Sequence, residues 1–183
     1  MKKEIKLVSD FNFDLFYNYL INKIDKKKYE LVKPNYELFI NKCYNMIKLN
    51  KKSHIIFIWT RIEGVIKEFD SLVNFKKISH KKLDEEVDNY INILKQLSKK
   101  TDYLIVTSWT LPYLAKGQYL NDLTDDFGIS KNLNEINLKI TEKLKKVPNI
   151  FFLNIEFLLQ KNFQTFNPKL WYATKVPYNN QLF

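Results

Sequence analysis

The chain has 183 residues, of which 45% are hydrophobic and 27% charged, and its formal net charge is +10. A chain of this length can bury one core, so we expect a single domain over residues 1–183. The hydrophobic content excludes a disordered chain. Cys43 is the only cysteine, which excludes an internal disulfide and a cysteine-ligated metal cluster.

The positive charge comes almost entirely from lysine, because Arg61 is the only arginine. Lysine, asparagine and isoleucine are all frequent, as codon bias in an AT-rich genome produces. Lysines of this origin lie on solvated surfaces, whereas base-reading sites favour arginine. We therefore expect no nucleic-acid partner, with a patch for another anionic partner as the alternative. Five lysine runs lie at or near the ends of expected elements: 26–28, 51–52, 76–77, 81–82 and 145–146.

Neither a signal peptide nor a membrane span is predicted. No apolar stretch near the start has the length of a signal peptide, and no run approaches the roughly 20 apolar residues that cross a bilayer. The expectation is a cytoplasmic protein.

The hydrophobic pattern predicts alternating strands and helices. Five short apolar runs have the pattern of strands, and several of them are continuous, as in strands buried on both faces: 5–8, 29–32, 55–59, 103–106 and 150–153. Four segments between them carry apolar residues at helical spacing: 13–20, 36–47, 83–97 and 129–144. Ser79 is a candidate cap for the third of these helices.

This alternation predicts an α/β fold, a three-layer sandwich with helices on both faces of a five-stranded parallel sheet. The commonest doubly wound order for five strands is 2-1-3-4-5, whose switch point lies between the first and third strands. Ligands of such sheets bind beyond the carboxyl ends of the strands at that point. We therefore expect the ligand site at residues 9–12 and 59–63.

Polar residues follow four of the predicted strands at this edge. Helix N-termini and loop amides converge there and favour anions or developing oxyanions. The alternative is that Ser9, Asp10 or Asn12 only caps the first helix. The strand-end set consists of Ser9, Asp10, Asn12, Thr60, Arg61, Glu63, Thr107, Ser108, Asn154 and Glu156.

No catalytic triad, metal site or phosphate loop is visible. His54 precedes the third strand, at the amino edge, and His80 begins a helix that we also expect to start at the amino edge, so neither is placed as a base for Ser9. The acidic clusters 84–86 and 122–126 lack histidine and cysteine, which argues against a metal centre. The three glycines are isolated.

Two aromatic segments lack periodicity, 109–127 and 163–183. Long non-periodic segments in small domains are often functional loops or docking segments. The alternative is that both cover the carboxyl edge of the sheet as hydrophobic lids. Cys43 lies on an apolar helix stripe and is expected to be a packing residue.

Three segments resemble the amino-terminal region of FkbH-like proteins: 5–14, 133–137 and 166–178. The most specific of them contains Trp171, Tyr172 and Pro177, and the resemblance runs through the whole chain in this order. In that family the region is SGNH-hydrolase-like and precedes a haloacid dehalogenase-type domain of subfamily IIIC. The resemblance therefore implies a flavodoxin-like SGNH sandwich.

The resemblance also implies an accessory role. Full-length members dephosphorylate a glyceryl phosphate donor and load the glyceryl unit onto a carrier-protein thiol, or serve in polyketide and surface-polysaccharide pathways. That chemistry belongs mainly to the dehalogenase-type domain, whose paired strand-end aspartates this sequence does not contain. The chain thus resembles the accessory domain alone.

The sequence departs from active SGNH hydrolases at both ends of their active site. Their first block ends in Gly-Asp-Ser, where this chain has Ser9, Asp10, Phe11 and Asn12 without the glycine. Their last block is Asp-x-x-His before a proline, where this chain has Tyr172 and Lys175. Lys175 can act as a base only if its pKa is lowered from about 10.4, and it could equally hold a phosphate or carboxylate.

Three functional hypotheses follow. The preferred one is a non-hydrolytic SGNH-like module that binds an acylated, phosphorylated or carrier-linked partner in polysaccharide or secondary-metabolite biosynthesis, without cofactor or metal. The second is an esterase or acyltransferase with Ser9 as nucleophile and a non-histidine base. The third is a docking domain for a separate dehalogenase-type enzyme. The candidate catalytic residues are Ser9, Asp10 and Lys175, and the candidate ligand-binding residues are Asn12, Thr60, Arg61, Ser108, Trp109 and Asn154.

Overall fold

Five parallel strands form one sheet in the order β2-β1-β3-β4-β5, as predicted. The computed structural model describes residues 2–34, 37–74, 76–110, 122–124, 128–160 and 176. The strands are β1 (Lys3–Val8), β2 (Tyr29–Val32), β3 (Ser53–Ile58), β4 (Thr101–Thr107) and β5 (Ile150–Leu153). Because all of them are parallel, their carboxyl ends share one edge, and the switch point lies between β1 and β3.

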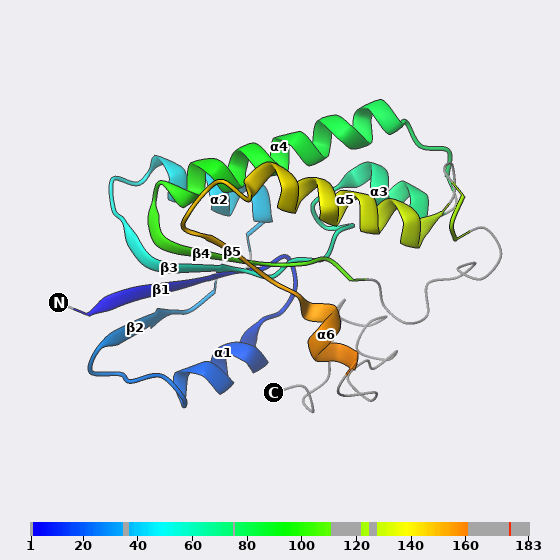
Figure 1. The fold of residues 1–183 in the computed structure, drawn as a ribbon. Coiled ribbons are helices and arrows are strands. Elements are labelled where there is room, and N and C mark those ends of the chain that lie inside the picture. Colours follow the sequence, from blue (N-terminus) through cyan, green and yellow to red (C-terminus); the bar gives the residue numbers. More distant parts are fainter. Residues whose placement is uncertain are drawn as a thin grey trace.

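Helices cover both faces of the sheet, which confirms the three-layer sandwich (Figure 1). One face carries α2 (Phe39–Lys48), α3 (Lys67–Val73), α4 (His80–Ser98) and α5 (Ile129–Leu144), and the other carries α1 (Asp14–Ile21) and α6 (Ile155–Gln160). The sequence predicted neither α3 nor α6. With 7 and 6 residues, they are too short to establish a hydrophobic period.

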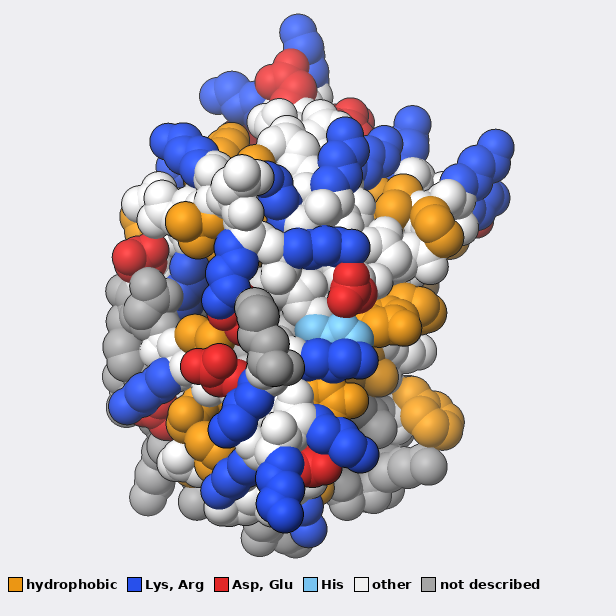
Figure 2. Space-filling model, turned by 90° about the vertical axis from the view of Figure 1, so that its left-hand side faces the viewer, with side chains coloured by type: hydrophobic (Ala, Val, Ile, Leu, Met, Phe, Trp, Pro, Cys, Tyr) orange, Lys and Arg blue, Asp and Glu red, His pale blue; other side chains and the backbone are white. Residues whose placement is uncertain are grey.

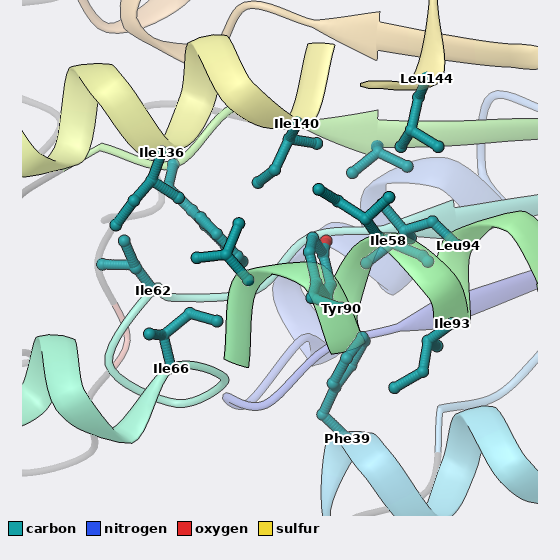
Figure 3. Close-up of a cluster of buried hydrophobic side chains, with 14 of the residues drawn as sticks. Phe39, Ile58, Ile62, Ile66, Tyr90, Ile93, Leu94, Ile136, Ile140 and Leu144 are labelled. Atoms are coloured by element: carbon teal, nitrogen blue, oxygen red, sulfur yellow. The ribbon is translucent and has the colours of Figure 1, made fainter. Parts of the chain in front are cut away.

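The larger core lies between the sheet and the helices α2 to α5 (Figure 3). Ile56 and Ile58 of β3 point into it and are 1% and 0% exposed. The stripe predicted for α4 packs against them, and Ser79 caps this helix by accepting a hydrogen bond from the Lys82 backbone N–H, as expected. Cys43 of α2 is fully buried in this core, and burial raises its thiol pKa to about 12, so it is a packing residue.

The smaller core lies between the sheet and α1, and it is rich in aromatic rings. Phe11, Phe13, Phe16 and Trp59 form edge-to-face and tilted pairs with centroids 4.8 to 6.2 Å apart. Ring pairs of this geometry are favourable beyond the area they bury. They fix the start of α1 against the carboxyl end of β3.

The direction of the helices corrects one expectation about His80. A helix that joins two parallel strands runs against them, so α4 begins on the carboxyl side of the sheet, and Figure 1 shows its first residue there. His80 therefore lies on the carboxyl side, where its side chain is exposed, and not at the amino edge. His54, at the start of β3, does lie at the amino edge. None of the helices described is long and apolar enough to cross a bilayer.

Candidate functional site

The carboxyl ends of β1 and β3 are connected by an ion pair between Asp10 and Arg61. Arg61 Nη2 and Nε lie 2.9 and 3.0 Å from Asp10 Oδ2, and the Arg61 backbone N–H donates to Asp10 Oδ1 at 2.8 Å. The side chains are only 7% and 16% exposed. Both carboxylate oxygens are thus engaged, and the pair holds the loop after β3 against the end of β1.

Gly64 allows this loop to approach Asp10 closely. A Cβ atom at Gly64 would lie 1.7 Å from Asp10 Oδ2 and 2.6 Å from its Cγ. Any other residue at this position would force the carboxylate or the loop to move. The isolated glycine in the sequence is therefore explained by the proximity of a carboxylate 54 positions earlier in the chain.

A second buried carboxylate, that of Glu63, shares the same guanidinium. Glu63 Oε1 lies 3.8 Å from Arg61 Nη1, and the Glu63 side chain is 13% exposed. Burial raises the pKa of both Asp10 and Glu63, and the attraction of Arg61 opposes it. The single arginine of the chain thus faces two acids, which leaves it no simple role as an anion receptor.

Ser9, the candidate nucleophile, is 4% exposed. Its Oγ accepts a hydrogen bond from the Phe11 backbone N–H at 3.2 Å. Within the described part of the chain, no carboxylate, imidazole or ammonium lies within hydrogen-bonding distance of that hydroxyl. Ser9 thus stabilises its own turn at the end of β1.

Lys42 brings a buried ammonium to the same strand end. The residue is 7% exposed, and its Nζ donates to the Ser9 carbonyl oxygen at 3.4 Å. Among the residues described, no carboxylate lies within 4.0 Å of this Nζ. Burial lowers the Lys42 pKa, while the more distant Glu37 acts in the opposite direction. The single long hydrogen bond compensates little of the desolvation of this cation.

Three of the predicted binding residues instead cap helices. Asn12 Oδ1 accepts from the Asp14 backbone N–H at 2.9 Å at the start of α1, and Ser108 Oγ accepts from Ile155 N at 3.1 Å at the start of α6. Asn154 Oδ1 accepts from the Phe157 backbone N–H at 3.3 Å. These bonds satisfy helix N–H groups that lack an intrahelical partner, so the capping alternative holds for Asn12.

Thr60 and Trp109 belong to a buried polar network between the strand ends and the helices. Trp109 Nε1 donates to Thr60 Oγ1 at 3.0 Å, and the hydroxyl of the fully buried Tyr90 also bonds to Thr60. Asn137 of α5 holds the Trp109 backbone by two bonds, accepting from N at 3.0 Å and donating to O at 2.8 Å. The network fixes the end of β4 and leaves Thr60 and Trp109 buried.

Thr107, the last residue of β4, carries another buried polar group at this edge. Its Oγ1 is buried and forms no hydrogen bond with the residues that the structure describes. Buried hydroxyls are normally paired. Lys42 and Thr107 are thus two described groups of this edge with unused hydrogen-bonding capacity.

The other sequence-based candidates do not complete the site. Lys175, Trp171 and Tyr172 lie outside the described residues. So do most of the two aromatic segments. No group of three metal-ligating side chains occurs in the part of the chain that is described.

Sequence reasoning missed Lys42 and Gly64. Lys42 precedes Cys43 at the edge of the apolar stripe of α2. At such a position the sequence pattern does not distinguish a buried lysine from a solvated one. Its position in the first turn was the available signal, since helix starts lie on the carboxyl side of the sheet. Gly64 carries no signal in one sequence, because its partner is distant along the chain.

Comparison with known proteins defines the fold. The structure is similar to the N-terminal part of the protein BF1531 from Bacteroides fragilis, described as containing a phosphatase domain complexed with Mg, with a TM-score of 0.68 over 98% of this chain at 11% identity. It is also similar to protein YXIM from Bacillus subtilis, with a TM-score of 0.51 over 89% of this chain at 14% identity. This chain spans about half of each, 48% and 46%.

At the sequence level, no family model matches the chain. A curated relative, Protein PFC0760c from Plasmodium falciparum, is 30% identical over 142 residues, which are 75% of this chain and 4% of that protein. The chain therefore spans only a small part of that relative. These comparisons give the chain an α/β fold that it shares with part of larger proteins.

Proposed function

We propose that the chain is a non-hydrolytic, SGNH-like accessory module that binds the anionic group of a phosphorylated, acylated or carrier-linked partner at the carboxyl edge of its sheet. The observation that supports this most is the buried ammonium of Lys42. The shared fold with the BF1531 fragment is consistent with a module that accompanies a catalytic domain. The biosynthetic setting rests on the resemblance to FkbH-like proteins.

The electrostatics of Lys42 support an anionic ligand. A buried charge is stable only when another charge or several hydrogen bonds compensate its lost hydration. Lys42 has one hydrogen bond, at 3.4 Å, within the described chain. A phosphate or carboxylate bound next to Nζ would supply the missing interactions and raise the pKa of Lys42 toward its ordinary value.

The neighbouring residues favour binding over hydrolysis. The Ser9 hydroxyl is bonded within its own turn, and Arg61 is held by Asp10. We therefore assign the Asp10 and Arg61 pair a positioning role, in which it fixes the loop beside Ser9. Lys175 remains a candidate second cation in this proposal, on the basis of the sequence.

Titration calorimetry with inorganic phosphate, acetyl phosphate and phosphopantetheine tests the proposal. We expect at least one of these probes to bind the wild-type chain, and Lys42→Met to weaken it at least ten-fold. Lys48→Met is the matched control, because Lys48 lies on the same helix but is exposed. Absence of binding by all three probes, or equal affinity in Lys42→Met, would contradict the proposal.

The second candidate function is acyl transfer or ester hydrolysis from Ser9. Lys42 is the observation in its favour, because its pKa is lowered and its Nζ lies 3.4 Å from the Ser9 carbonyl oxygen. To act as the base, Nζ would have to move from this carbonyl to the Ser9 hydroxyl. Labelling with a fluorophosphonate probe that disappears in both Ser9→Ala and Lys42→Met would support this function. No labelling, or labelling that persists in Ser9→Ala, would exclude it.

A further inference from the structure

The connections at the amino edge of the sheet are rich in lysine and poor in acidic residues. Each helix between two strands returns the chain to this edge, so the connections before β2, β3, β4 and β5 all meet there. These connections, residues 22–28, 49–52, 99–100 and 145–149, contain ten lysines and one acidic residue, Asp25. Nine of the ten lysines are exposed. Figure 2 shows this face with lysine side chains over much of its surface.

Composition alone does not account for this asymmetry. The described residues that connect strands and helices at the carboxyl edge contain four cations and four acidic residues: Lys33, Arg61, Lys76, Lys77, Asp10, Glu37, Glu63 and Asp122. A codon bias toward lysine affects both edges equally. The imbalance is therefore a property of the amino edge.

A row of aromatic rings crosses four strands next to these lysines. His54 of β3 stacks on Tyr29 of β2 at 6.0 Å between ring centroids and meets Tyr103 of β4 edge-on at 5.3 Å, and Tyr103 lies 6.1 Å from Phe151 of β5. Tyr103 and Phe151 are 46% and 48% exposed. The other two residues, Tyr29 and His54, are partly buried. The exposed part of the row is therefore the pair of Tyr103 and Phe151, 6.1 Å apart, which suits the stacking of flat ligands.

A pocket of about 260 Å³ opens beside the row. Its lining contains four lysines and three acidic residues, and Lys51 forms an ion pair with Glu4: Lys2, Lys3, Lys51, Lys52, Glu4, Glu30 and Asp102. On its wall Asp102 accepts from both Lys52, at 2.7 Å, and His54 Nδ1, at 2.9 Å, so the carboxylate is neutralised and orients the imidazole within the row.

We infer that the amino edge binds single-stranded nucleic acid, a function distinct from the ligand site proposed at the opposite edge. Phosphates lie along the lysine connections, and bases stack on Tyr103 and Phe151. Both features are required: lysines alone attract any polyanion, whereas the exposed rings need a ligand with flat faces. The scarcity of arginine predicted no nucleic-acid partner, because lysine is a poor base reader. Recognition by stacking and phosphate contacts does not require base reading.

Fluorescence anisotropy with labelled oligothymidine of about 15 nucleotides tests the inference, since such proteins cover roughly 4–16 nucleotides per site. We expect a dissociation constant of about 10⁻⁶ to 10⁻⁴ M that rises steeply with salt. Tyr103→Ala combined with Phe151→Ala should weaken binding at least five-fold. Lys51→Gln combined with Lys52→Gln should reduce the slope of log K against log salt by about 1.4, since each phosphate contact with a single strand contributes about 0.7.

The matched control removes two lysines from the other edge, Lys76→Gln with Lys77→Gln, and should leave the affinity within two-fold of wild type. Circular dichroism confirms that each variant is folded. The inference is overturned if no binding occurs at 50 mM salt, if the control variant loses as much affinity as the amino-edge variants, or if a duplex of the same length or anionic vesicles bind as tightly as oligothymidine. The last two outcomes would show attraction of charge without stacking.

Discussion

At the carboxyl edge of the sheet, Asp10 and Arg61 pair through side chains that are 7% and 16% exposed, whereas at the amino edge Lys52 and Asp102 pair through side chains that are 59% and 46% exposed. The distances are similar, 2.9 and 2.7 Å. Only the surroundings differ. Removing one partner of a buried pair leaves an unpaired buried charge, whereas water and salt compensate for the loss of an exposed partner.

This difference suggests that the two edges bind different kinds of ligand. The charged groups closest to the end of β1 at the carboxyl edge are few, balanced in sign and largely buried, as in a site that holds one small ligand in a fixed position: Asp10, Glu63, Arg61 and Lys42. Charges at the amino edge are many, mostly positive and mostly exposed, as on a surface that attracts a large polyanion. The following variants test this comparison, from the largest expected effect to the smallest.

Arg61→Ala should cause the largest loss of stability. It leaves the Asp10 carboxylate buried without its cation, and breaking a buried pair costs about 3–5 kcal/mol. Urea unfolding measures the loss, with Lys67→Ala, an exposed lysine, as the control. Adding Asp10→Asn to Arg61→Ala should recover part of the loss. A loss below about 1 kcal/mol would mean that the carboxyl-edge pair behaves like an exposed one.

Gly64→Ala should destabilise the chain by about 1–3 kcal/mol, the usual range for overpacking. The new methyl group meets Asp10 Oδ2 at 1.7 Å and has to displace the carboxylate or the loop. The same change in an Asp10→Ala background should be nearly neutral, and this double-mutant cycle assigns the effect to the contact. If Gly64→Ala costs the same stability with and without the Asp10 side chain, the cause lies in the backbone at position 64 and not in the contact.

Glu63→Gln should stabilise the chain at pH 7. The gain should be smaller than the losses expected for Arg61→Ala and Gly64→Ala. Burial raises the Glu63 pKa in the folded state above its unfolded value, so the folded chain binds more protons between these two values. The stability of the wild type therefore falls as pH rises through this window. The advantage of the variant should appear above the window and vanish below pH 4.5, the ordinary pKa.

Urea unfolding of the Gln variant and the wild type between pH 4 and 8 measures the difference, with the exposed Glu85→Gln as control. A Glu63→Gln chain less stable than the wild type at pH 7 would show that attraction to Arg61, 3.8 Å away, outweighs the cost of burial.

Asp102→Asn should have the smallest effect. Hydrogen bonds from Lys52 and His54 lower the Asp102 pKa, but the residue is exposed and water replaces the lost interactions. We expect an unchanged urea midpoint and, because an acid is removed from the basic edge, slightly tighter binding of oligothymidine at low salt. A clear loss of stability would contradict the contrast between the two edges.

Much of the fold could be predicted from the sequence. The runs 29–32, 129–144 and 150–153 match β2, α5 and β5 residue for residue, and the strand order followed from alternation alone. Local hydrophobic periodicity carries this information because each strand and helix buries its own face. The sequence also identified Ser9, Asp10 and Arg61 as strand-end residues. The predicted switch point also implied that Asp10 faces Arg61, but not that the two side chains form an ion pair across 51 positions.

The roles of the candidate residues depended on contacts that no periodicity encodes. Asn12, Ser108 and Asn154 are helix caps, and Thr60 and Trp109 are bound into a network with Tyr90 and Asn137. Whether a polar side chain at a strand end caps a helix, joins a network or remains available is decided by the direction of its neighbours. Those neighbours come from distant parts of the chain.

By itself the sequence determined the order of the strands and the excess of lysine, since both follow from residue types and their spacing. Only the tertiary structure showed that Lys42 lies buried beside Ser9, that Gly64 makes room for a carboxylate, and that ten lysines share one edge with a pair of exposed rings. The physical reason is that charge and burial act through space. The sequence pattern around a helical lysine is the same whether its ammonium group is solvated or buried against a backbone carbonyl.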